Sequence, residues 1–110
     1  MRKVAQHVLV NRAQLLHELR TTTRPKGATQ SDELGQPVFT QESDRDGVCA
    51  CALMAEMFGQ QHNGRLSLPR AVRALGINSK MCRYIQQQIN DTPLTFPEIA
   101  DRIETEVFTT

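Results

Sequence analysis

The most reactive side chains in this sequence are its three cysteines, Cys49, Cys51 and Cys82. Cys49 stands at the start of an apolar, helix-forming stretch, where aligned backbone N–H groups favour a thiolate, and His62 offers a base. This pair is typical of a cysteine-dependent enzyme. However, Cys49 and Cys51 are surrounded by Ala, Val, Leu and Met, and free cysteines are among the residues most often buried. We therefore predict that both thiols pack in the core, and we predict no catalytic residue.

Zinc binding is the second chemistry that these residue types permit. The candidate ligands are Cys49, Cys51, Cys82, His7, His17 and His62. A Cys-x-Cys pair on a helix points its thiols about 200° apart, and the histidines stand singly along the chain. Gly-rich phosphate loops, Gly-x-Ser-x-Gly elbows and His-Glu-x-x-His pairs are also missing. The sequence thus predicts no metal site, no cofactor and a non-enzymatic protein.

Basic and amide side chains between Leu68 and Asn90 form a third set. Two short helices are predicted here, with Gly76 in the turn between them, as in a helix-turn-helix. The apolar residues that such a motif needs at its contacts are Ala71, Leu75, Ile77, Cys82 and Ile85. Candidates for nucleic-acid contacts are Arg70, Arg73, Lys80, Arg83, Gln86 and Gln87. Any two helices joined through a Gly share this apolar pattern, so a DNA-binding regulator is the alternative interpretation.

The charges of the chain are segregated along the sequence, although its net charge is only +1. No acidic residue occurs from Met57 to Asn90, whereas residues 27–56 and the tail after Asn90 are predominantly acidic. Because the acidic blocks offset the basic one, we expect no specific duplex binding near physiological salt. The expected partner is another protein or a second copy of the chain, with nucleic acid as the alternative and no membrane.

Length and composition restrict the class of protein further. The chain has 110 residues, of which 39% are hydrophobic and 5% aromatic, as expected for one small domain with an aliphatic core. No apolar run approaches the roughly 20 residues that span a bilayer, and Met1-Arg2-Lys3 opens no signal peptide. An odd number of cysteines argues against a disulfide framework. We therefore expect a cytoplasmic protein.

Hydrophobic periodicity predicts a mostly α, compact five-helix domain. The predicted helices cover about residues 2–20, 48–58, 68–75, 79–90 and 96–107, and the 48–58 helix is apolar almost all round and therefore central. Thr95-Phe96-Pro97-Glu98 is a capping box, and Ile99, Ile103 and Val107 form the buried stripe of the last helix. A long polar loop covers residues 21–47, and Pro37-Val38-Phe39-Thr40 is its one stretch with strand character.

Two segments resemble a group of small bacterial and phage proteins with no assigned biochemical function. Leu94-Thr95-Phe96-Pro97-Glu98-Ile99-Ala100-Asp101-Arg102-Ile103-Glu104 is similar to their Ser-Phe-x-Glu-Ile-Ala-Asp-x-Ile-Glu segment, which follows an Asn-Asp pair like Asn90-Asp91. The helix from Val48 is similar to their Cys-Cys-Leu-Gly-Val-Leu helix, although Ala50 replaces the second Cys and Ala52 the Gly. The resemblance implies a small helical fold and no activity. From the residues themselves we expect a protein-interaction or regulatory module that presents its basic surface to a partner.

Overall fold

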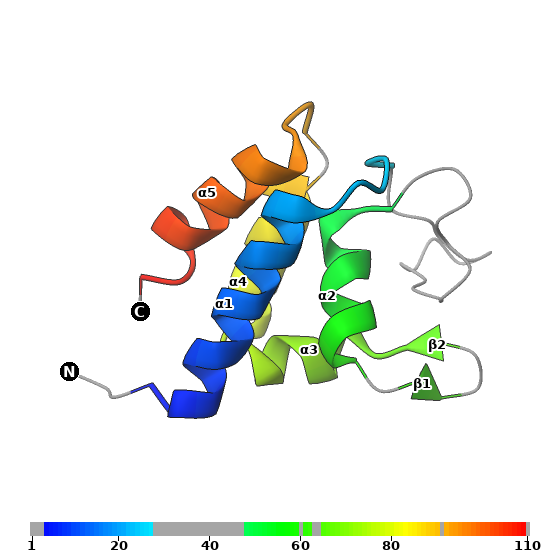
Figure 1. Ribbon diagram of the computed structural model, residues 1–110. Helices are drawn as coiled ribbons and strands as arrows, with labels where there is room; N and C mark the ends of the chain where they lie inside the picture. Colours follow the sequence, from blue (N-terminus) through cyan, green and yellow to red (C-terminus); the bar gives the residue numbers. More distant parts are fainter. Residues whose placement is uncertain (1–3, 28–47, 60, 63–64, 91, 110) are drawn as a thin grey trace.

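The computed structural model describes residues 4–27, 48–59, 61–62, 65–90 and 92–109. These residues form a predominantly helical structure (Figure 1). Its elements are α1 (Gln6–Thr21), α2 (Ala50–Phe58), β1 (Gln61–His62), β2 (Arg65–Leu66), α3 (Leu68–Ala74), α4 (Ser79–Tyr84), the π-helix η1 (Ile85–Asn90) and α5 (Phe96–Glu106). The mostly α fold predicted from the sequence is confirmed. The proposed strand at 37–40 and most of the 21–47 loop lie outside the described residues.

Helix α2 lies in the interior, as its apolar composition indicates. Every residue from Ala50 to Ala55 is buried, and this helix packs closely against α3. Its N-terminus is capped twice: the Cys49 thiol accepts from the Ala52 N–H, and the buried Asn90 side chain accepts from the Ala50 N–H at 2.7 Å. At its C-terminal end a Cβ on Gly59 would lie 2.5 Å from the Ser67 carbonyl oxygen. The close approach of the Ser67 backbone therefore requires glycine at position 59. Backbone conformation does not, since any residue can adopt its φ of −83°.

Helices α1 and α5 lie side by side, and α1 packs against α2 (Figure 1). Ile99, Ile103 and Val107 are buried as predicted, and the capping box of Thr95 and Glu98 starts α5. On α1, Val8, Leu15 and Leu19 are buried. Two features of α1 differ from the prediction. The helix begins at Gln6, because Ala5 is extended and has no capping side chain. Leu9 is 45% exposed, at the edge of the apolar stripe formed by Val8, Leu15 and Leu19.

A short antiparallel hairpin, absent from the sequence prediction, connects α2 to α3. Strand β1 pairs with β2 in the register Gln61 opposite Leu66 and His62 opposite Arg65. Each strand has only two residues, too few for the alternating apolar pattern by which strands are recognised in a sequence. The hairpin lies beside the end of α2, away from α5 (Figure 1).

The predicted helix over residues 79–90 is wrong in its second half, because regular α-helix ends at Tyr84 and continues as the π-helix η1. A π-turn holds about one more residue than an α-turn, so residues five apart share a face. Ile85 and Asn90 are both fully buried on that face, together with Ile89. The wider turn thus allows the Asn90 side chain to reach the N-terminus of α2 while both isoleucines stay in the core.

Candidate interaction surface

Four basic side chains lie exposed on two consecutive helices. Arg70 and Arg73 project from α3, and Lys80 and Arg83 project from α4. None of the four forms an ion pair within the part of the chain that the structure describes. We refer to these four exposed side chains, Arg70, Arg73, Lys80 and Arg83, as the basic face. Four of the six nucleic-acid candidates predicted from the sequence are therefore accessible on α3 and α4.

The two glutamines among the predicted candidates differ in their accessibility. Gln87 is exposed, whereas Gln86 is half-buried. The residues Lys80, Arg83 and Gln87 recur every three or four positions, so they form one solvent-facing stripe along α4 and η1. We call this continuous helical segment, residues 79–90, the α4–η1 rod. Its first two residues, Ser79 and Lys80, and the cap residue Asn78 are all exposed, so this end of the rod is accessible to solvent.

The apolar positions of the predicted helix-turn-helix are all in the interior. Ala71, Leu75 and Ile85 have no exposed surface, and Ile77 and Cys82 are each 8% exposed. Burial raises the pKa of the Cys82 thiol, which keeps this side chain neutral. The unit therefore places its apolar side chains inward and its cations outward, as the sequence pattern requires.

The turn between α3 and α4 is a Schellman motif centred on Gly76. The Gly76 N–H donates to the Arg73 carbonyl, and the Ile77 N–H donates to the Val72 carbonyl. Gly76 has a φ of +65°, a conformation that residues with a Cβ rarely adopt. A Cβ at this position would also lie 2.7 Å from Cγ1 of Val8, so both conformation and space require glycine.

Side chains from α1 bind the remaining carbonyl groups of this turn. The Asn11 amide donates to the Ala74 carbonyl at 2.9 Å, and the Arg12 guanidinium donates to the carbonyls of Leu75 and Gly76 at 2.8 and 3.2 Å. The five carbonyls from Val72 to Gly76 thus all accept a hydrogen bond, so the end of α3 has no orphaned acceptor. This saturation fixes the direction in which α4 leaves α3.

Arg12 performs this role from inside the protein. Its residue surface is only 5% exposed, and its guanidinium carbon lies 4.9 Å from the centre of the Phe108 ring. Burial lowers the pKa of Arg12 from its ordinary value, because the interior disfavours the charged form. Arg12 therefore connects α1, the turn after α3 and the C-terminal residues. The sequence analysis missed it, although its place four residues after Val8 on the apolar stripe was an available signal.

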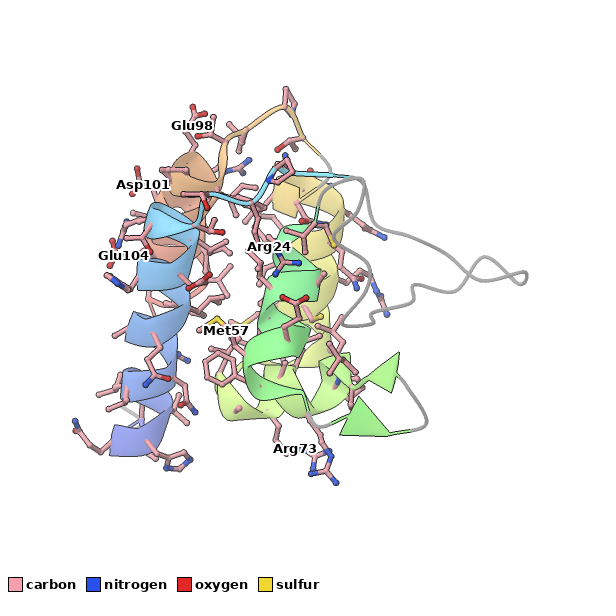
Figure 2. All side chains as sticks on the ribbon, turned by 45° about the vertical axis from the view of Figure 1, so that its right-hand side comes forward. Arg24, Met57, Arg73, Glu98, Asp101 and Glu104 are labelled. Carbon is pink, nitrogen blue, oxygen red and sulfur yellow. The ribbon has the colours of Figure 1, made fainter. Side chains whose placement is uncertain are left out.

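Four carboxylates of the described residues are paired with arginines. Arg20 of α1 donates to Asp101 and Glu104 of α5, Arg24 pairs with Glu56, and Arg102 pairs with Glu106. Glu98, Asp101 and Glu104 lie along α5, whereas Arg73 lies at the opposite end of the molecule (Figure 2). Asp101 and Glu104 are thus both paired with an arginine and distant from Arg73.

One edge of the α4–η1 rod is joined to α5 by a polar network. Tyr84 donates to the Glu106 carboxylate, and Arg102 donates to that carboxylate and to the Gln88 carbonyl. Hydrogen bonds from Arg102 and Tyr84 lower the pKa of Glu106 to about 2. The same carboxylate raises the pKa of Tyr84. Because Arg102 neutralises Glu106, the network adds little negative charge beside the stripe.

The cysteine arrangement does not support thiol chemistry. Cys49 and Cys51 are 3% and 0% exposed, which confirms that both are buried, and none of the three cysteines forms a disulfide bond. The side chain of His62, the proposed base, lies outside the described residues. Within the described residues, no group of three or more His, Cys, Asp or Glu side chains is arranged to hold a metal ion.

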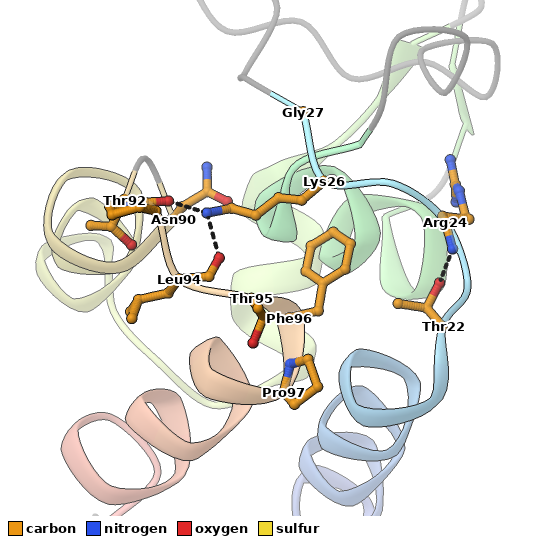
Figure 3. A pocket seen from close by; sticks show the side chains of 11 residues that line it. Thr22, Arg24, Lys26, Gly27, Asn90, Thr92, Leu94, Thr95, Phe96 and Pro97 are labelled. Carbon is orange, nitrogen blue, oxygen red and sulfur yellow. Dashed lines mark hydrogen bonds between the residues drawn. The ribbon is translucent and has the colours of Figure 1, made fainter.

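A pocket of about 770 Å³ lies between the segment that leaves α1 and the segment that enters α5 (Figure 3). Lys26 reaches across it and donates to the backbone carbonyls of Thr92 and Leu94. Arg24, on the same wall, binds Glu56 through two hydrogen bonds. Both cations of the lining therefore hold neighbouring parts of the chain together, and we assign no ligand to this pocket.

Searches for similar proteins add no family to this description. No family model matches the chain, and neither the curated proteins nor the solved structures include a significant match. The resemblance of residues 94–104 to small bacterial and phage proteins stays a prediction. No helix among the described residues is long and apolar enough to cross a membrane.

Proposed function

We propose that this chain is a non-enzymatic binding protein that attaches to a negatively charged macromolecule through the basic face. The observation that carries this proposal is the exposure of Arg70, Arg73, Lys80 and Arg83 without carboxylate partners among the described residues. Solvent-exposed cations attract a polyanion and raise the rate at which the protein and the polyanion associate. The saturated turn beneath them provides a rigid support.

An enzymatic alternative has less support from the same residues. A catalytic thiol must be accessible to its substrate, whereas Cys49 is buried and its sulfur accepts a hydrogen bond from the backbone at 3.3 Å. Its place at the N-cap of α2 gives it a structural role. The thiol therefore belongs to the packing of the central helix.

Retention on immobilised heparin, a flexible polyanion, tests the proposal. We expect the protein to bind at low salt and to elute later than its Arg83→Ala variant, because each contact with an anionic group releases counterions. Arg20→Ala is the matched control, since it also removes one positive charge but lies on the α1–α5 flank. Its exposed ion pairs contribute little to stability, so the control should remain folded. Equal elution of the two variants, or no retention at low salt, would contradict the proposal.

Two classes of macromolecule carry enough negative charge to be this partner: acidic protein surfaces and nucleic acids. The charge balance along the sequence favours a protein. The geometry of the α3–α4 unit gives an independent basis for choosing between them.

A further inference from the structure

We propose that the partner of the basic face is double-stranded DNA, with the α4–η1 rod in the major groove and α3 across the phosphate backbone. This inference rests on the proposed function and names its partner. It follows from the turn geometry, the shape of the rod and the polarity of the surface around it.

The first argument is the geometry of the turn. A helix-turn-helix joins two helices through three or four residues, usually with a Gly, and buries apolar side chains from both helices. Here Gly76 occupies the left-handed position, and Asn78 caps α4 by accepting from the Met81 N–H at 2.8 Å. Figure 1 shows α3 lying across the lower end of the bundle and α4 rising from it behind α1. The second helix is therefore set at an angle to the first.

The second argument is the fit between the rod and the groove. An α-helix with its side chains is about 10–12 Å wide, and the major groove of B-DNA is about 12 Å wide. The stripe from Lys80 to Gln87 is at most about 10 Å long at 1.5 Å per residue, because the π-helical part rises less per residue, and this length spans up to about three base pairs. Lys80, Arg83 and Gln87 would face base edges, since Arg and Lys bind guanine and Gln binds adenine there.

Arg70 and Arg73 complete the footprint from the first helix. In helix-turn-helix complexes the first helix crosses the backbone, so these two guanidinium groups are placed for phosphates. Neither is tied to a carboxylate in the described part of the chain. Glu106 of α5 contacts the rod through Tyr84, and its carboxylate forms an ion pair with Arg102. Repulsion between this edge of the protein and DNA is therefore weak.

The third argument is the composition of the surface, which disfavours a protein partner. The centres of protein–protein interfaces are apolar and rich in aromatic residues. Among the large hydrophobic side chains of the described residues, only Leu9, Val10 and Tyr84 are exposed. Leu9 and Val10 lie on α1, and the Tyr84 hydroxyl donates a hydrogen bond to Glu106. The basic face is thus polar and cationic, as protein–DNA interfaces are.

Fluorescence anisotropy of three labelled polyanions tests the inference with the full chain. The probes are a random-sequence DNA duplex, one of its strands alone, and heparin. We expect tighter binding to the duplex than to the single strand, with log K falling by about 0.9 per phosphate contact as log salt rises. Arg70→Ala should make this slope shallower by about one unit, whereas Arg20→Ala should leave it unchanged.

Base readout has its own test, because it does not depend on charge. Selection from a random duplex pool should enrich a consensus, and Gln87→Ala should weaken binding to that consensus by about tenfold at an unchanged salt slope. Gln14→Ala, which removes an exposed amide from α1, is the control. Binding to heparin without preference for the duplex would overturn the DNA inference and leave the proposed function intact. If no polyanion binds at low salt, both are wrong.

Discussion

Among the described residues, Arg12 is the only charged residue that is buried. A buried charge is tolerated only where it is hydrogen-bonded, and Arg12 meets this condition by donating to two carbonyls beside the Phe108 ring. Position 12 falls on the apolar stripe of α1, where periodicity alone leads one to expect an aliphatic residue. Pattern analysis therefore finds the position but misses the role, because the acceptors lie 63 and 64 residues away in the sequence.

Replacing Arg12 by Met should lower the free energy of unfolding by about 2 kcal/mol, because the carbonyls of Leu75 and Gly76 lose their charged donor. Arg12→Lys should restore only part of the loss, since one ammonium cannot reproduce the forked donor geometry. Urea denaturation of both variants measures this, with Gln14→Ala as a surface control. A stable Arg12→Met protein would show that the turn needs no support from Arg12.

Glu106 provides a test of electrostatics at a single exposed carboxylate. Its pKa of about 2 in the folded protein lies below the usual 4.5, because Arg102 and Tyr84 donate to its charged form. A depressed pKa stabilises the fold above pH 4.5, and this contribution disappears as the pH falls toward 2. Thermal melts of the protein and its Glu106→Gln variant should therefore differ at neutral pH and converge across that acidic window. A difference that stays constant with pH would exclude this ion pair as a source of stability.

The helices show which parts of the fold follow from local sequence. Thr95 with Glu98, Ser67 before Pro69, and Asn78 all cap helices where their residue types predict a start. Those signals act within three or four residues and are therefore visible in the sequence. The π-helix η1 and the capping of α2 by Asn90 depend on contacts between distant segments, so periodicity predicted an unbroken α-helix there.

Helix α2 is the element on which the core depends. Leu53 is 1% exposed at its middle, so Leu53→Ala should lower the free energy of unfolding by about 2–5 kcal/mol through lost burial and the cavity left behind. The matched control is Leu9→Ala on α1, since that leucine is 45% exposed and loses little packing. Chemical denaturation distinguishes the two, and comparable small effects would show that α2 is peripheral.

At the scale of the molecule, the positions of the charged side chains matter more than the net charge. The net charge of +1 led to the expectation of a protein partner, because the sequence does not reveal which charges face the same direction. Once folded, Arg73 of the basic face and Asp101 of α5 lie at different ends of a molecule that measures 42 × 29 × 22 Å. At physiological salt the Debye length is about 8 Å, so charges at these two ends act almost independently.

This independence predicts how binding responds when charge is changed far from the basic face. The double variant Asp101→Asn and Glu104→Gln raises the net charge of the protein by two units, on the side occupied by Arg20. Near physiological salt we expect its affinity for a DNA duplex to stay within about twofold of the unchanged protein, because screening removes the long-range effect. At about 0.01 M salt the Debye length reaches about 30 Å, and the variant should then bind more tightly. Arg83→Ala, measured beside it by anisotropy, should weaken binding at both salt concentrations, since that side chain acts by direct contact. A strong gain for the double variant at physiological salt would mean that net charge, and not the basic face, governs the interaction.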